Sequence, residues 1–147
     1  MFLSVASEDI SVAHAVCGAL EVEGITCWVA SRDVTPGELY ADAIVHAMDG
    51  AKVMVLVLSR NAATSPHVLR EVERATSRSR PVISFRVDEA PLPDALEYFL
   101  NTSQWLESKG DVADALPKLV DAVRRHLGNF GPSQARRDDS IDRPASE

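Results

Sequence analysis

Two neighbouring stretches, VMVLVL at Val53–Leu58 and SPHVLREVE at Ser65–Glu73, decide the fold of this chain. The first is continuously apolar and has the length of a strand, as in a parallel sheet that is covered on both faces. The second predicts the start of a helix, because Ser65 is a good N-cap residue and Pro66 suits the first helical position. A strand followed by a helix is the repeating unit of a parallel α/β sheet.

The helix from Pro66 carries a carboxylate beside its apolar stripe. On a 3.6-residue wheel this stripe consists of Val68, Leu69, Val72, Ala75 and Thr76. Glu71 lies at the edge of the stripe, one turn after His67, and Arg70 and Arg74 point the opposite way. A carboxylate in that position can face a pocket at the top of the sheet. From the helix geometry alone, a solvated glutamate is the alternative.

The rest of the chain alternates strands with helices. The expected strands are Phe2–Val5, Ile25–Val29, Val53–Leu58, Pro81–Val87 and Gln104–Leu106. The first helix is expected to be capped by Ser7 and to stop at Gly24. Further helices are expected at Tyr40–Met48, from Pro66, at Ala95–Leu100 and before Gly128, the last with Pro117 in its first turn. Pro36-Gly37 predicts a turn within a loop at Ser31–Leu39.

This order of elements predicts an α/β fold of flavodoxin-like size. We expect an open parallel sheet of five strands in the order 2-1-3-4-5, with helices on both faces. The domain covers residues 1–127, and the polar residues 128–147 form a flexible tail. Ligands of such sheets bind outside the carboxyl ends of the strands, at the switch point between the first and third strands in chain order. This topology places Glu71 near the expected site.

Composition excludes several classes of protein. The chain has 147 residues, enough for one domain with a substantial core, and its net charge of -7 argues against nucleic acid or an anionic membrane as the main partner. The sequence shows neither an apolar run of membrane-spanning length nor the pattern of a signal peptide, so we expect a cytoplasmic protein. Cys17 and Cys27 lie in apolar contexts and are expected to be reduced core thiols. The cysteines and the four histidines show no metal-ligand spacing.

Other functions of flavodoxin-like proteins lack their motifs. A response regulator needs a phosphorylatable aspartate after the third strand, where this chain has Leu58-Ser59. A flavodoxin needs a phosphate loop after the first strand, where Ser7-Glu8-Asp9 would repel phosphate. The sequence contains no dinucleotide-binding GxGxxG motif, no Walker loop and no GxSxG elbow, and no cysteine has a plausible histidine partner.

Four segments of the chain, in order, carry a family resemblance, and the first two are FLSVASED (residues 2–9) and CWVASRDVTPG (27–37). These two are similar to the opening box and to the second strand and BB loop of the Toll/interleukin-1 receptor (TIR) domains of bacterial type. Val55–Ser59 with Ser65–Glu73 resembles the third strand and the helix that carries the functional glutamate. The segment from Phe99 to Trp105 resembles the late FL…WL box. The resemblance covers residues 1 to about 127.

The resemblance implies an enzyme that cleaves NAD⁺ as its substrate, needs no cofactor, and releases nicotinamide with ADP-ribose or a cyclised isomer. Glu71 would then be catalytic, because a carboxylate can stabilise an oxocarbenium-like ribose and bind its hydroxyl groups. Glu73, on the other flank of the helix, is the less favoured candidate. The residues expected to bind or shape the substrate site are Ala6, Ser7, Trp28, Arg32, Asp33 and His67. Where this chain has His67 the family often has tryptophan, so the surface for base stacking is smaller, and His67 is spaced to pair with Glu71.

The resemblance also implies self-association. The BB loop, with Val34, Thr35, Pro36 and Gly37, docks on a neighbouring subunit in this family and can complete the site. Two functions therefore stay open at this stage. One is a self-associating NAD⁺ glycohydrolase or cyclase in bacterial defence or signalling, and it requires Glu71. The other is a non-catalytic TIR–TIR interaction module, and it requires only the BB loop and helix surfaces.

Overall fold

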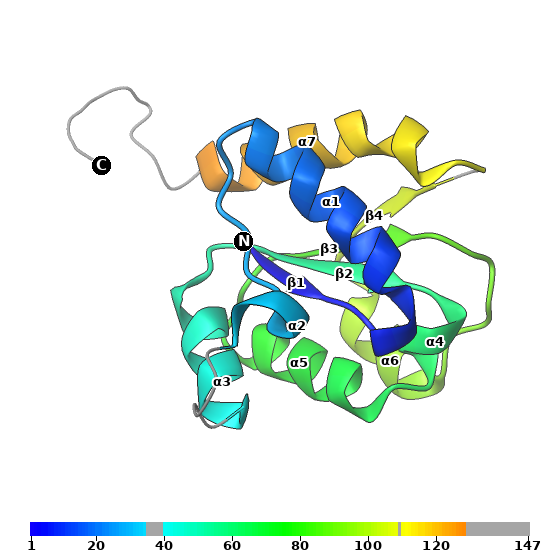
Figure 1. Cartoon of the computed structure of the whole chain (residues 1–147). Coiled ribbons are helices and arrows are strands. Elements are labelled where there is room, and N and C mark those ends of the chain that lie inside the picture. The colour runs from blue at the N-terminus through cyan, green and yellow to red at the C-terminus, as the bar shows by residue number, and fades with distance from the viewer. Residues whose placement is uncertain (35–39, 109, 129–147) are drawn as a thin grey trace.

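A four-stranded parallel sheet forms the middle of three layers (Figure 1). The structure is a computed structural model that describes residues 1–34, 40–108 and 110–128. The strands are β1 (Phe2–Ser4), β2 (Met54–Leu58), β3 (Val82–Arg86) and β4 (Gln104–Glu107), and they lie in the order β1-β2-β3-β4. In the register of the sheet, Ser4 of β1 lies beside Leu56 of β2, and Leu56 lies beside Ser84 of β3. The α/β class and the parallel sheet are thus confirmed, with four strands in place of five.

Helices cover both faces of this sheet. The described helices are a 3₁₀ turn η1 (Ser7–Asp9), α1 (Ile10–Val22), α2 (Ala30–Asp33), α3 (Tyr40–Gly50), α4 (Arg60–Ala63), α5 (Pro66–Ser77), α6 (Asp94–Leu100) and α7 (Val112–Gly128). Helices α1 and α7 pack on one face, and α3, α5 and α6 lie on the other (Figure 1).

The apolar run before Ser59 is explained by these two layers. Val53, Val55 and Val57 belong to the core under α1 and α7. Met54, Leu56 and Leu58 belong to the core against α5 and α6. Successive side chains of a strand point to opposite faces, so a strand covered on both sides is apolar at every position.

The predicted strand Ile25–Val29 is wrong. Only Trp28 forms a bridge, with Phe2 of β1, through backbone hydrogen bonds from Trp28 N to Met1 O and from Leu3 N to Trp28 O, each 2.9 Å. The segment does lie beside β1, where strand 2 of the predicted order belongs. A ladder does not develop because β1 has only three residues and the chain turns into α2 at Ala30.

Three local predictions are also corrected. Ser7 does not cap α1, because it is itself the first residue of η1, and Asp9 at the N-cap of α1 makes no side-chain cap bond. Pro117 lies inside α7, in its second turn. The predicted loop from Ser31 begins within a helical turn, α2. The prediction that α1 stops at Gly24 is confirmed, since Gly24 has a φ of 81°, a left-handed conformation that favours glycine.

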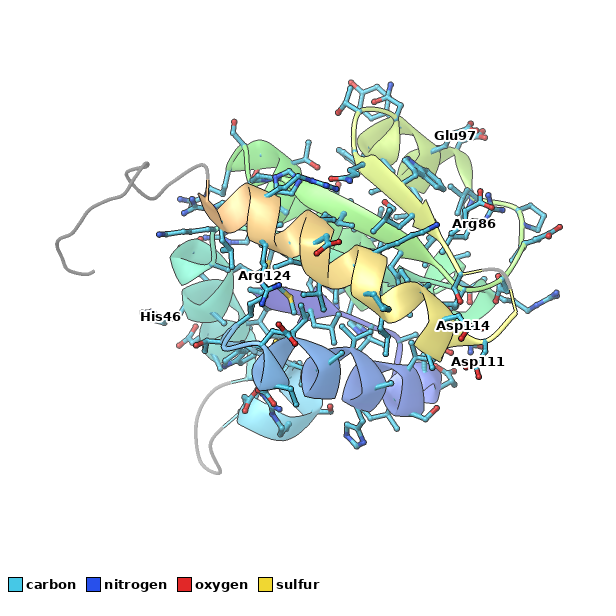
Figure 2. All side chains as sticks on the ribbon, turned by 90° about the horizontal axis from the view of Figure 1, so that it is seen from above. His46, Arg86, Glu97, Asp111, Asp114 and Arg124 are labelled. Atoms are coloured by element: carbon cyan, nitrogen blue, oxygen red, sulfur yellow. The ribbon has the colours of Figure 1, made fainter. Side chains whose placement is uncertain are left out.

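Helices α1 and α7 lie side by side across the sheet (Figure 2). Arg124 near the end of α7 pairs with Glu23, just after α1. Asp111 and Asp114 lie at the opposite end, around the start of α7 (Figure 2). Within the described residues, no helix combines the length and apolar character needed to cross a membrane. Residues 129–147, most of the predicted tail, lie outside the described residues.

Candidate functional site

Glu71 is a buried carboxylate in the apolar face of α5. Glu71 is only 6% exposed, and the other buried residues of the same helix are Val68, Val72 and Ala75. The hydroxyl of Ser65 accepts a hydrogen bond from Val68 N, and Pro66 occupies the first turn, as the sequence predicts. Glu71 therefore lies within the stripe that faces the sheet, whereas the helical wheel places it at the edge of that stripe. The solvated alternative does not hold.

One hydrogen bond from the sheet holds this carboxylate. The hydroxyl of Ser4 in β1 donates to Oε1 of Glu71 at 2.7 Å, and both residues are buried. Oε2 accepts no hydrogen bond from the described part of the chain. Burial raises the pKa of Glu71, whereas the Ser4 hydrogen bond and the nearby charges of His67 and Arg70 act to lower it. The desolvation of the charged form dominates, so the pKa lies above that of an ordinary glutamate.

His67 connects the start of α5 to the end of β1. Its Nε2 lies 3.2 Å from the carbonyl oxygen of Val5, and its Nδ1 lies 3.0 Å from Oγ of Ser65. A carbonyl only accepts, so Nε2 carries a proton, and in a neutral ring Nδ1 accepts from the Ser65 hydroxyl. That hydroxyl also accepts from Val68 N, which leaves every member of the chain of bonds satisfied. The contact fixes the backbone beside the carboxylate.

A small cleft opens over Glu71 at the outer edge of β1. Its polar lining consists of Ser7, Ser31, Tyr40, His67 and Glu71, and its apolar walls are Leu3, Val5, Ile10, Val29 and Ala30. The cleft has a volume of about 40 Å³. That is close to the space one water molecule occupies in the liquid, roughly 30 Å³. Tyr40 lies at the rim and is 54% exposed. Its pKa is raised, mainly by partial burial of the hydroxyl and secondly by the negative charge of Glu71.

Two predicted site residues, Ser7 and His67, therefore line this cleft together with Glu71. Ala6 is buried in the core between β1 and α5 and lies outside the lining. Trp28 also lies outside it, and its ring stacks on Phe2 with centroids 5.3 Å apart and planes inclined by 17°. The indole is partly buried against the core that contains Phe2.

Arg32 and Asp33 build the wall behind the cleft. Asp33 Oδ2 accepts a hydrogen bond from Val29 N at 2.9 Å, which fixes the turn into α2. Arg32 pairs with Glu21 and Asp33 and donates to the carbonyl of Cys27 at 2.8 Å. These contacts place Val29, Ala30 and Ser31 against the pocket. Of the predicted BB loop, Val34 is half-buried after α2, and Thr35, Pro36 and Gly37 lie outside the described residues.

Sequence reasoning missed the apolar walls of this site and three of its polar residues: Ser4, Ser31 and Tyr40. Ser4 is a polar residue in a fully buried strand, and such a residue requires a hydrogen-bond partner, which is a usable signal. Ser31 and Tyr40 flank the BB loop, and nothing in their local pattern indicates which way they face. Across the described residues, no group of three or more His, Cys, Asp or Glu side chains could hold a metal ion.

Comparison with known proteins gives the family. The sequence profile of the TIR domain matches residues 1–120. The stimulator of interferon genes protein of Magallana gigas is 27% identical over 132 residues, which cover 78% of this chain and 32% of that protein. The chain thus spans about a third of the length of this relative.

Solved structures of TIR domains have the same fold as this chain. The TIR domain of the Toll-related receptor TRR-2 from Hydra magnipapillata is 25% identical, with a TM-score of 0.69, over 84% of this chain and 96% of that one. The TIR domains of the activated Roq1 resistosome share the fold at 18% identity, with a TM-score of 0.71, over 83% of this chain and 97% of that one. The profile match over residues 1–120 shows that the chain belongs to the TIR domain family.

Proposed function

We propose that this TIR domain is an NAD⁺ glycohydrolase or cyclase in which Glu71 is the catalytic carboxylate. The single observation that carries the proposal is a buried glutamate that has one oxygen held by Ser4 and lines a cleft at the edge of the sheet. A buried carboxylate at a cleft, with a raised pKa and a specific partner, is a physical indication of a functional site.

The chemistry requires one carboxylate and no general acid. The bond between C1′ of the ribose and the pyridinium nitrogen breaks, and both electrons stay on nitrogen, so nicotinamide leaves as a neutral molecule. The ribose becomes oxocarbenium-like, and the negative charge of Glu71 stabilises it. Water then adds to C1′ and loses a proton, giving ADP-ribose. Attack by a nucleophilic atom of the ADP portion gives a cyclic isomer instead.

The substrate is larger than the cleft, so binding requires its rim to open. Tyr40, Ser31 and Ser7 are the exposed members of the lining and are the side chains that can move without disturbing the core. Leu3, Val29 and His67 are held by packing or by hydrogen bonds and would stay in place. We therefore propose that nicotinamide and its ribose enter from the Tyr40 side.

The test compares wild type with Glu71→Gln for nicotinamide release from NAD⁺, followed by chromatography. Glu73→Gln is the matched control, because Glu73 is exposed on the same helix two residues further on. We expect release by wild type and by Glu73→Gln and none by Glu71→Gln, and the second product separates hydrolysis from cyclisation. Equal release by all three would remove Glu71 from the mechanism. No release by any of them, even at high protein concentration, would leave the TIR–TIR interaction module as the function.

We further propose that activity depends on self-association, in signalling or defence. The Roq1 TIR domains, by the description of their structure, are part of an activated resistosome that recognises a pathogen effector. The expected result is a specific activity that rises with protein concentration, in parallel with the mass measured by light scattering. Pro36→Ala is expected to reduce both together. Activity independent of concentration would show that the single domain suffices.

A further inference from the structure

We propose that Ser4 is the positioning residue of the Glu71 carboxylate and holds it by Oε1, so that Oε2 is the oxygen presented to the substrate. This inference rests on the function proposed above. Ser4 does not line the cleft, so it acts only through Glu71. Its hydroxyl lies 2.7 Å from Oε1 and comes from a residue 67 positions away in the sequence.

The surroundings of Ser4 are otherwise apolar. Phe2 in β1 and Ala6 just after it pack in the core against α5, and the partner of Ser4 in register is Leu56. Ser4 itself is 0% exposed. In such a row an apolar side chain would pack without needing a partner, whereas a buried hydroxyl needs a hydrogen bond. Within the described residues, the side chain of Ser4 hydrogen-bonds to Glu71 alone, which gives the serine a specific role at this position.

The hydrogen bond also acts on the ionisation of Glu71, against the effect of burial. Ser4 donates, and a hydrogen bond donated to a carboxylate stabilises its ionised form. The other groups that face Glu71 are His67 and Arg70 on its own helix and Tyr40 at the start of α3. His67 and Arg70 favour the ionised form as well, but His67 is engaged with Val5 and Ser65, and Arg70 is exposed. Ser4 is the group in direct contact with the carboxylate.

The experiment measures the pH dependence of nicotinamide release by wild type and Ser4→Ala. Ser84→Ala is the matched control: Ser84 is also 0% exposed, on β3 at the same level of the sheet, and its Oγ lies 3.0 Å from Oγ of Ser103, away from the cleft. A second measurement follows the Glu71 carboxyl directly by ¹³C NMR titration, with Glu71→Gln to assign its resonance. Thermal unfolding checks that each variant folds.

Loss of Ser4 is expected to move the acid limb of the activity profile and the NMR midpoint of Glu71 to higher pH together. Because a hydrogen bond to a charged group contributes about 1.5–3 kcal/mol, activity at a given pH on the acid limb should fall between about 10- and 100-fold, and it should recover at high pH. Ser84→Ala should keep the wild-type profile. The same fractional loss at every pH, with an unchanged NMR midpoint, would overturn the proposal in favour of a packing role. If wild type releases no nicotinamide, the proposed function fails, and the NMR titration alone decides on Ser4: a raised midpoint supports the contact and an unchanged one overturns it.

Discussion

Replacing Glu71 by glutamine is expected to stabilise the protein at neutral and higher pH. The residue is 6% exposed, and burial raises its pKa because the charged form loses its hydration. A group with a raised pKa in the folded state gives its full stability below the unfolded pKa and loses it as the pH rises through the folded pKa. Above the folded pKa, wild type therefore holds a charge that costs free energy of folding. Glutamine keeps the shape and an oxygen for the Ser4 hydroxyl to donate to, without the charge.

The size of the effect follows from two opposing contributions. Desolvation of a buried ion costs several kcal/mol in real proteins, and a hydrogen bond such as that from Ser4 stabilises the ion by about 1.5–3 kcal/mol. Because the pKa of Glu71 stays raised, the desolvation cost is larger than the stabilisation by the hydrogen bond. Each unit by which the folded pKa exceeds the unfolded one lowers stability by about 1.4 kcal/mol. We expect Glu71→Gln to be more stable than wild type at pH 8 by about 1–3 kcal/mol, or roughly 2–12 °C in Tm for a domain of this size.

The assay is thermal unfolding followed by circular dichroism between pH 4 and pH 8. The gap between Glu71→Gln and wild type should be largest at pH 8 and should close toward pH 4, near the ordinary glutamate pKa of 4.5. Glu73→Gln, at an exposed position, should stay within about 0.5 kcal/mol of wild type at every pH. A Glu71→Gln variant that is no more stable than wild type at pH 8, or a gap of equal size at both pH values, would refute this reasoning.

Three further changes test other parts of the structure. Phe85→Ala empties a fully buried position on β3 and should lower the free energy of unfolding by about 3–5 kcal/mol in a urea titration. Pro117→Ala restores a backbone N–H inside α7 and should raise stability, by up to about 3 kcal/mol, in the same titration. Asp33→Ala removes the acceptor of Val29 N at the cleft wall; it should lower stability by about 1 kcal/mol, and hydrogen exchange at Val29 should become faster.

The sheet was predictable because its signals are local. Val53–Leu58 is apolar at every position, and both cores of the structure use it, so the pattern determined its place between two helical layers. The predicted strand Ile25–Val29 failed because its apolar residues are buried without forming a ladder. Cys27 and Val29 are as buried as strand residues, yet only Trp28 pairs with β1. Burial and pairing are separate properties, and the sequence pattern reports only the first.

The site was predictable to the extent that topology places it. The end of β1 and the start of α5 meet at the outer sheet edge, which brought Ser7, His67 and Glu71 together. The contacts that follow from three-dimensional packing were not accessible in this way. Whether Trp28 stacks on Phe2 or faces the cleft depends on a side-chain orientation across the bridge. Tyr40 reaches the rim because α3 begins there, and no local periodicity records that.

Ser4 and Glu71 interrupt two apolar surfaces that would otherwise match. The row on β1 that begins at Phe2 and the stripe on α5 that contains Val68 and Val72 pack against each other in one core. Two apolar side chains of similar volume at positions 4 and 71 would fill the same space without any desolvation of charge, and such replacements are often neutral or stabilising. The core does not need the Ser4–Glu71 pair, and the charge of Glu71 lowers the stability of the folded protein at neutral pH. The presence of the pair is therefore explained by a requirement other than stability. Glu71 lines a cleft, and among the described residues nothing donates a hydrogen bond to its Oε2, so a ligand that carries positive charge or hydroxyl groups would meet that requirement.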